Sequence, residues 1–163
     1  MTRQNAYNFG FDSIDGRAVP LSDFQGSVIM VVNTASQCGL THQYIGLQKL
    51  WDQYKNRNFM LIGVPSNDFG NQESGNLSEI KTFCETNYGV DFLLTSKVRV
   101  KGAGAHPFYT WADSQVNFFR KPRWNFHKYI VDSTGELVGS FSSLCAPQSS
   151  RIIRAIDLCL SET

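Results

Sequence analysis

The sequence lacks the features that mark several common classes of protein. It has no apolar run of 18 residues, so no stable insertion into a membrane is expected. The formal net charge is only +1, so no overall basic field favours a nucleic acid or an anionic membrane as a partner. The amino terminus, MTRQNAYNFGF, has no apolar stretch of the kind found in a secretory signal peptide. We therefore expect a cytoplasmic location.

The sequence is also poor in cysteine and histidine, and neither residue is clustered. The four cysteines are Cys38, Cys84, Cys145 and Cys159. They include no C-x-x-C pair and are too scattered for a secreted disulfide scaffold, so they are expected to be thiols in a reducing compartment. The three histidines are His42, His106 and His127. Because none has a partner at metal-ligand spacing, we expect no metal and no other cofactor.

The composition is that of one ordinary globular domain. The chain has 163 residues, of which 42% are hydrophobic and 13% aromatic, and it has no linker, repeat or low-complexity tract. We expect a single domain over residues 1–163. A local basic cluster, Arg120, Lys121 and Arg123, is of the kind that usually forms solvated surface.

Hydrophobic periodicity predicts the secondary structure. The predicted helices are Leu40–Lys55, Leu77–Tyr88 (capped by Asn76 or Ser78), Pro107–Asp113 and Gln148–Leu160. The predicted buried strands are Ser27–Ala35 and Asn58–Pro65. The other predicted extended segments are Asn8–Phe11, Arg17–Pro20, Lys97–Val100, Trp124–Asp132 and Glu136–Ser142, the last two forming a hairpin.

This order of elements indicates an α/β protein with the thioredoxin-like plan. A parallel β-α-β unit followed by an antiparallel hairpin predicts a mixed sheet flanked by helices, with an extra amino-terminal β-hairpin. In open α/β sheets, chemistry collects beyond the carboxyl ends of the strands. Cys38 follows the first parallel strand and residues 66–72 follow the next, so the two loops are expected at one edge of the sheet.

The cysteines differ in their expected surroundings. Cys38 precedes a helix, whose amino terminus favours a thiolate, but a small packing residue would fit the position equally well. Cys84 lies near the centre of an apolar helical stripe, and Cys159 shares its stripe with Ile152 and Ile156, so both positions suit a core residue. Cys145 precedes the last helix. His127 is expected at the surface or at a sheet edge.

Three separated motifs resemble the glutathione peroxidase family across almost the whole chain. NTASQCGLT (Asn33–Thr41) is similar to the segment around the peroxidatic cysteine or selenocysteine, which implies that role for Cys38. PSNDFGNQESG (Pro65–Gly75) is similar to PCNQFGxQEPG and implies a catalytic Gln72. WNFHKYIVD is similar to WNFxKFLV and implies the remaining catalytic pair, Trp124 and Asn125.

A fourth motif points to the two-cysteine, thioredoxin-dependent subgroup without selenium. EIKTFCETNYGVDF (Glu79–Phe92) resembles the helix that holds the resolving cysteine, which implies that role for Cys84, 46 residues after Cys38. The chain departs from the family at Ser66, Asp68 and Ser74, which affects the expected loop geometry and pocket charge. Only about 14 residues separate Tyr109 from Trp124, which is too short for the insertion of tetrameric relatives and implies a monomer or weak dimer.

The resemblance implies an antioxidant thiol peroxidase that responds to oxidative stress. It would reduce hydrogen peroxide and organic or lipid hydroperoxides through a Cys38 sulfenic acid and a Cys38–Cys84 disulfide. Thioredoxin is the implied reductant and glutathione the lesser option. Two alternatives stay open, namely a peroxide sensor that passes its disulfide to a client protein and a glutathione-dependent one-cysteine peroxidase.

Overall fold

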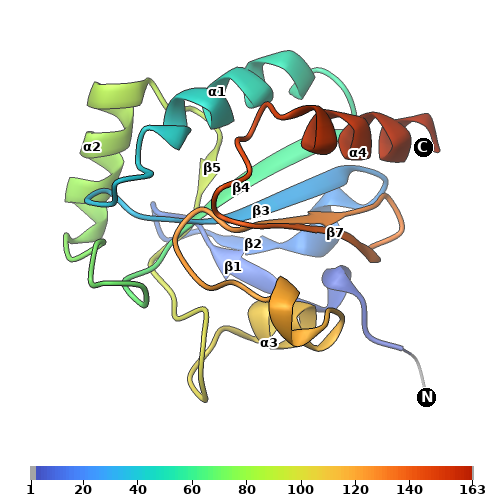
Figure 1. Ribbon diagram of the computed structural model, residues 1–163, viewed down its shortest axis with the longest axis horizontal. Coiled ribbons are helices and arrows are strands. Elements are labelled where there is room, and N and C mark those ends of the chain that lie inside the picture. The colour runs from blue at the N-terminus through green and yellow to red at the C-terminus, as the bar shows by residue number, and fades with distance from the viewer. Residues whose placement is uncertain (1–2, 163) are drawn as a thin grey trace.

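A five-stranded mixed sheet forms the centre of the computed structural model, which describes residues 3–162 (Figure 1). Its strands are β3 (Val28–Thr34), β4 (Phe59–Pro65), β5 (Leu93–Leu94), β6 (Lys128–Val131) and β7 (Leu137–Phe141). The spatial order is β5-β4-β3-β6-β7. β3 pairs in parallel with β4 and antiparallel with β6, while β5 is parallel to β4 and β7 antiparallel to β6. The predicted mixed sheet is confirmed.

Helices and the amino-terminal hairpin cover both faces of this sheet. The helices are α1 (Gln43–Tyr54), α2 (Leu77–Tyr88), α3 (Pro107–Ser114) and α4 (Ser150–Ser161). The hairpin consists of β1 (Gly10–Asp12) and β2 (Ala18–Pro20). Side chains of α1, α2 and α4 pack on one face, whereas α3 and the hairpin pack on the other (Figure 1). All seven residues of β3 are buried, because its alternating side chains enter the two separate cores.

Local sequence signals define helix α2 sharply. The Asn76 side chain accepts a hydrogen bond from the Glu79 amide at 2.9 Å, and the Glu79 carboxylate accepts one from the Asn76 amide at 3.5 Å. This capping box satisfies donors at the first turn, so Asn76 rather than Ser78 is the cap. Gly89 ends the helix in the left-handed conformation, with φ at 60°. The predicted bounds of this helix are confirmed.

The predicted strand Lys97–Val100 is wrong. The strand that extends this edge of the sheet is β5, and residues 97–100 are irregular. The Val100 and Lys101 amides donate to the Asp68 carboxylate at 2.7 and 3.1 Å, respectively. Because these backbone donors are held by a side chain, they do not form a sheet ladder.

The predicted strand Trp124–Asp132 is too long at its start. β6 begins at Lys128, and Trp124–Phe126 form a turn instead. Phe126 has a φ of 68°, a left-handed conformation that bulky residues rarely adopt. Its buried ring meets the Tyr44 ring edge to face at a centroid distance of 5.4 Å, which holds the turn in place.

The prediction that His127 lies at the surface is also wrong. The side chain is buried between β6 and β7, where its Nε2 atom lies 2.8 Å from the Ser140 hydroxyl. Ser140 donates its own proton to the Arg120 carbonyl at 2.6 Å, so it accepts from His127. Burial lowers the pKa of His127 to about 4, so the ring is neutral at physiological pH.

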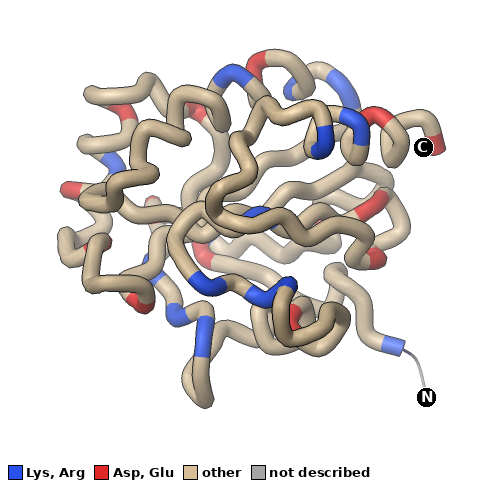
Figure 2. Tube along the Cα trace, viewed as in Figure 1, with Lys and Arg blue, Asp and Glu red and all other residues tan. Residues whose placement is uncertain are grey.

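Charged residues of both signs are spread over the molecule. Figure 2 shows Lys and Arg as well as Asp and Glu in many parts of the trace, and their numbers nearly balance, with a net charge of +1. Within residues 3–162, no helix has both the length and the apolar character needed to cross a membrane.

Candidate functional site

Three loop segments meet at one end of the sheet. Residues 35–42 follow β3, residues 66–76 follow β4, and residues 124–127 precede β6. Because β3 and β4 are parallel and β6 is antiparallel to β3, the ends of the first two strands and the start of the third lie at the same edge. The four positions implied by family resemblance are all in these segments.

Cys38 lies in a tight turn before α1. Helix α1 begins at Gln43, three residues later than predicted. The Cys38 amide donates to the Thr41 hydroxyl at 2.9 Å, and that hydroxyl donates to the Ala35 carbonyl at 2.9 Å. The Leu40 amide donates to the Cys38 sulfur at 3.3 Å. The turn therefore aims a backbone donor at a thiol that is only 9% exposed.

Gln72 joins the loop after β4 to the other two segments. Its side-chain oxygen accepts a hydrogen bond from Asn125 Nδ2 at 3.0 Å. Its backbone carbonyl accepts one from the Gln37 amide, next to Cys38, at 3.0 Å. Asn125 Nδ2 also donates to the Phe69 carbonyl at 3.3 Å. With the Gln72 oxygen occupied by Asn125, its side-chain amide N–H groups are the donors left to face a ligand.

Trp124 is half-exposed at the rim of this cluster. A Cβ atom at Gly70 would lie 2.8 Å from the indole ring, so only glycine allows this approach. The same Cβ would lie 3.3 Å from the Gln72 amide, which shows that the indole and that amide border one small space. The Asn33 side chain donates to the Trp124 carbonyl at 3.0 Å and ties the segment to β3.

The structure thus brings Gln72, Trp124 and Asn125 into one cluster beside the Cys38 turn. Among residues 3–162, the hydrogen bond to the sulfur comes from Leu40, and none comes from the three cluster side chains. Sequence reasoning missed Thr41, which fixes the Cys38 turn, and Asn33, which ties the Trp124 segment to β3. Both lie in the segment NTASQCGLT, but a buried polar side chain leaves no pattern in hydrophobic periodicity.

Cys84 is fully buried on the inner face of α2, as predicted for a core residue. Burial, with smaller effects of the Glu73 and Glu85 carboxylates, raises the pKa of its thiol to about 11. The neighbouring Tyr44 hydroxyl lowers the Cys84 pKa in part. All four cysteines are free, and Cys159 is also buried as predicted.

The departures from the family pattern have structural partners here. Asp68 holds the backbone of residues 100–101 and forms an ion pair with Arg99 at 3.6 Å. The buried Ser66 hydroxyl accepts from the Asp68 amide at 3.3 Å, which fixes the start of the loop. Ser74 is exposed. Asp68 and Ser66 therefore brace this loop, and the Gln72–Asn125 hydrogen bond is in place.

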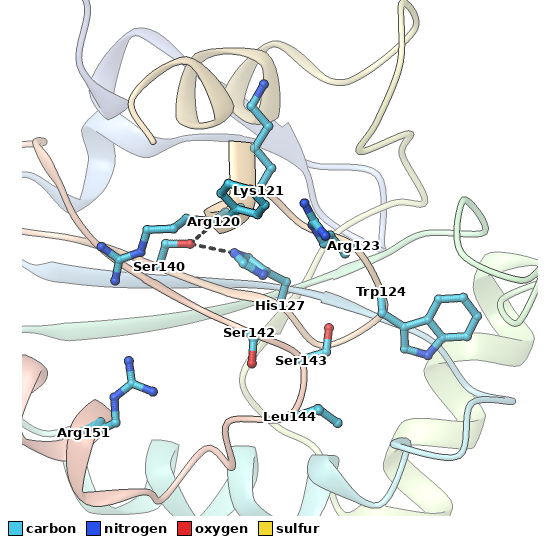
Figure 3. A pocket seen from close by; sticks show the side chains of 11 residues that line it. Arg120, Lys121, Arg123, Trp124, His127, Ser140, Ser142, Ser143, Leu144 and Arg151 are labelled. Carbon is cyan, nitrogen blue, oxygen red and sulfur yellow. Dashed lines mark hydrogen bonds between the residues drawn. The ribbon is translucent and has the colours of Figure 1, made fainter. Parts of the chain in front are cut away.

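A basic pocket of about 390 Å³ opens beside Trp124 (Figure 3). Its cationic lining residues are Arg120, Lys121, Arg123 and Arg151. Among residues 3–162 no carboxylate lines it, and three serines add hydroxyl groups. The basic cluster expected to be solvated surface is thus part of a concave site that suits an anionic group. Figure 3 shows Trp124 at one end of the pocket and Arg151 towards the other.

The fold has known counterparts among solved structures. A thioredoxin-family thiol:disulfide interchange protein from Chlorobium tepidum TLS matches with a TM-score of 0.68 and 14% identity. The match covers 98% of this chain and 99% of that one. The fold is therefore thioredoxin-like.

The sequence comparisons define the family. The Glutathione peroxidase family model matches residues 6–113. A hydroperoxy fatty acid reductase from Synechocystis sp. is 44% identical over 149 residues, covering 86% of this chain and 88% of the relative. A glutathione peroxidase-like peroxiredoxin from Schizosaccharomyces pombe is 43% identical over 136 residues, covering 82% and 86%. The chain belongs to the glutathione peroxidase family, which makes it an enzyme of the peroxidase class.

Proposed function

We propose that Cys38 is the nucleophile of a thiol peroxidase. Its thiolate attacks one oxygen of a hydroperoxide and the O–O bond breaks. The leaving alkoxide, or hydroxide from hydrogen peroxide, takes a proton from solvent and departs as an alcohol or water. Cys38 becomes a sulfenic acid. The observation that carries the proposal is the cluster of Gln72, Trp124 and Asn125 next to the Cys38 turn. The Gln72 amide and the Trp124 indole N–H donate hydrogen bonds without carrying charge, which suits the negative charge that develops on the leaving oxygen. Asn125 donates to Gln72 and to the Phe69 carbonyl and so positions Gln72.

Replacing Gln72 with alanine is expected to slow this step by on the order of 10²–10³-fold. The substitution removes the amide donor and leaves Asn125 with one of its two acceptors, the Phe69 carbonyl. The measurement is the rate of Cys38 oxidation by hydrogen peroxide in stopped flow. Gln37→Ala is the matched control, because Gln37 is exposed and its backbone contact to Gln72 survives the change. Equal rates in the two variants would argue against the role of Gln72.

We further propose that Cys84 resolves the sulfenic acid. The Cys84 thiolate attacks the Cys38 sulfur, an S–S bond forms, the S–O bond breaks and water leaves. Disulfide geometry requires Cα atoms no more than about 7 Å apart. Cys84 is fully buried within an intact helix of 12 residues, so α2 is expected to unwind locally in each cycle.

Hydrogen exchange tests this movement directly. Amides of Ile80–Tyr88 are expected to exchange slowly in the reduced protein and much faster in the disulfide form, because opening removes their helical hydrogen bonds. Helix α4 serves as the internal control, since it has the same length and carries no proposed redox cysteine. Equal protection of α2 in the two forms would contradict the unwinding.

The proposed reductant of the disulfide is thioredoxin. The proposal is supported by the free, buried second cysteine on α2 and by the similarity to a protein named a peroxiredoxin. The basic pocket favours a second candidate, a one-cysteine cycle in which glutathione carboxylates bind beside Trp124. The alternative function, a peroxide sensor, would use the same two cysteines. It would pass its disulfide to a client protein instead of having it reduced by thioredoxin.

Lipid hydroperoxides are proposed substrates together with hydrogen peroxide and small organic hydroperoxides. One similar protein is named a hydroperoxy fatty acid reductase. In this chain, the basic pocket beside Trp124 also includes Phe119 and Leu144, which expose apolar side chains. A carboxylate and an acyl chain would both find complementary groups there. We also propose a monomer or weak dimer in the cytoplasm, where four free thiols remain reduced.

Hydroperoxide-dependent consumption of NADPH tests the function. One reaction contains thioredoxin and its reductase, and a second contains glutathione and glutathione reductase. Sustained turnover with thioredoxin is the expected result, and turnover with glutathione alone would favour the one-cysteine cycle. No turnover with either system, together with transfer of the disulfide to another protein, would favour the sensor. Comparing a fatty acid hydroperoxide with its methyl ester tests the basic pocket.

A further inference from the structure

Glu73 places a buried carboxyl group next to the proposed redox site. Its side chain is 1% exposed. One carboxylate oxygen accepts a hydrogen bond from the Ser36 amide at 3.2 Å. The other oxygen is buried and has no protein partner among the described residues. A buried carboxyl group is costly unless its oxygens are paired, so a position of this kind calls for a functional explanation.

The carboxyl group faces the gap between the Cys38 loop and helix α2. A cavity of about 190 Å³ lies there, with Ser36 and Gln37 on one side and Ile80 and Phe83 of α2 on the other. Figure 1 shows this loop and α2 at the same end of the sheet. The cavity is polar on the Glu73 side and large enough for several water molecules. It lies between the two elements that carry Cys38 and Cys84, and water in it can exchange protons with Glu73.

Buried polar atoms lie near both Glu73 and Cys84. The hydroxyl groups of Thr34, Ser36 and Tyr44 are buried and lack protein partners of full hydrogen-bond geometry. The Tyr44 hydroxyl lies against both the Thr34 hydroxyl and the Cys84 thiol. The negative charge of the Glu73 carboxylate raises the pKa of both Tyr44 and Cys84, so Glu73 interacts electrostatically with the thiol. Such sites typically hold ordered water that connects the polar groups.

We propose that Glu73 accepts the proton of the Cys84 thiol in the resolving step. This inference rests on the proposed role of Cys84. The proton passes from Cys84 to the Glu73 carboxylate by way of Tyr44 or water in the cavity. The Cys84 thiolate then attacks the Cys38 sulfenic sulfur, the S–S bond forms and the S–O bond breaks. The leaving hydroxide takes the proton from Glu73 and departs as water, which restores the carboxylate.

The acidity of Glu73 suits this task. Burial raises its pKa to about 6, and the Ser36 hydrogen bonds and Lys97 prevent a larger rise. A base with a pKa just below the working pH is ionised and still binds a proton readily. The thiol is the weaker acid while α2 is closed, so proton transfer is expected to accompany the opening of α2. The other charged groups around the cavity are Glu79 and Glu85 on α2 and Lys97 after β5.

Glu73→Gln is the decisive variant, because glutamine keeps an acceptor for the Ser36 amide but is no base. The two half-reactions are measured separately by stopped and quenched flow. Oxidation of Cys38 is expected to change by less than about 3-fold, whereas disulfide formation at pH 7.5 slows on the order of 10²-fold. In the wild type the rate of disulfide formation should rise through pH 6 with the ionisation of Glu73, and this rise should be missing in the variant.

Two further variants separate a chemical role from a structural one. Glu73→Asp keeps a carboxylate and is expected to retain the pH dependence at a reduced rate. Glu79→Gln removes an exposed carboxylate that lines the same cavity but keeps an amide oxygen for the α2 cap, and it is expected to change neither step. An unchanged rate of disulfide formation in Glu73→Gln, or a wild-type rate without the rise near pH 6, would overturn the inference. Failure of the wild type to form any Cys38–Cys84 disulfide would instead refute the proposed function.

Discussion

Replacing Cys38 with serine is expected to abolish peroxide reduction, with a loss of roughly 10⁴-fold or more, the scale seen when an enzyme loses its nucleophile. Serine fits the turn, and its hydroxyl group can accept the hydrogen bond that the Leu40 amide donates to the sulfur at 3.3 Å. Its hydroxyl group is not ionised at neutral pH and is a far weaker nucleophile towards a peroxide oxygen. The measurement is the second-order rate constant for consumption of hydrogen peroxide.

Cys145→Ser is the matched control for this substitution. Cys145 is a half-exposed thiol outside the candidate site, where it lies 3.2 Å from the Ser149 hydroxyl. The control is expected to keep the wild-type rate constant, and circular dichroism checks that both variants are folded. Substantial peroxide consumption by Cys38→Ser would mean that another cysteine is the nucleophile.

Replacing Cys84 with serine is expected to preserve the first reduction of hydroperoxide by Cys38 but to slow the turnovers that follow. Cys38 should still reduce about one equivalent of hydroperoxide, because its turn and its donor cluster do not include Cys84. Continued turnover with thioredoxin should fall by at least about 10²-fold, since no intramolecular disulfide can form. The measurement is a burst of peroxide consumption followed by the steady rate of NADPH oxidation.

Cys159→Ser provides the comparison for this second change. Cys159 is likewise a buried helical thiol, on α4, so serine makes the same change of side chain at a buried helical position. Its steady rate is expected to equal that of the wild type. If Cys84→Ser kept full turnover with thioredoxin, Cys84 would not be the resolving cysteine. If it kept turnover only with glutathione, the one-cysteine cycle would apply.

Much of the fold could be predicted because strong local patterns specify it. The continuous apolar run of β3 and the capped, periodic segment of α2 left little ambiguity. The errors arose where side chains in distant segments decide the structure. Asp68 takes the backbone donors of residues 100–101, and this contact replaced the predicted strand Lys97–Val100. A periodic pattern contains no information about such a contact.

At the candidate site too, local motifs could be recognised in the sequence, whereas contacts between distant segments could not. Family motifs identified Cys38, Gln72, Trp124 and Asn125, and the structure places them in three neighbouring segments. Their catalytic roles and that of Cys84 remain predictions. Glu73 could not be singled out, because its significance lies in burial at a cavity that forms only when the β4 loop packs against α2. His127 was misplaced for a similar reason, since its burial depends on β7.

The covalent state of the protein after a single oxidation tests the central claim most directly. Reduced protein is treated with one equivalent of hydrogen peroxide, remaining thiols are alkylated, and peptides are identified by mass spectrometry without reduction. The account predicts a disulfide between the peptides that contain Cys38 and Cys84, with Cys145 and Cys159 alkylated. Oxidation confined to Cys38, with Cys84 fully alkylated, would contradict it.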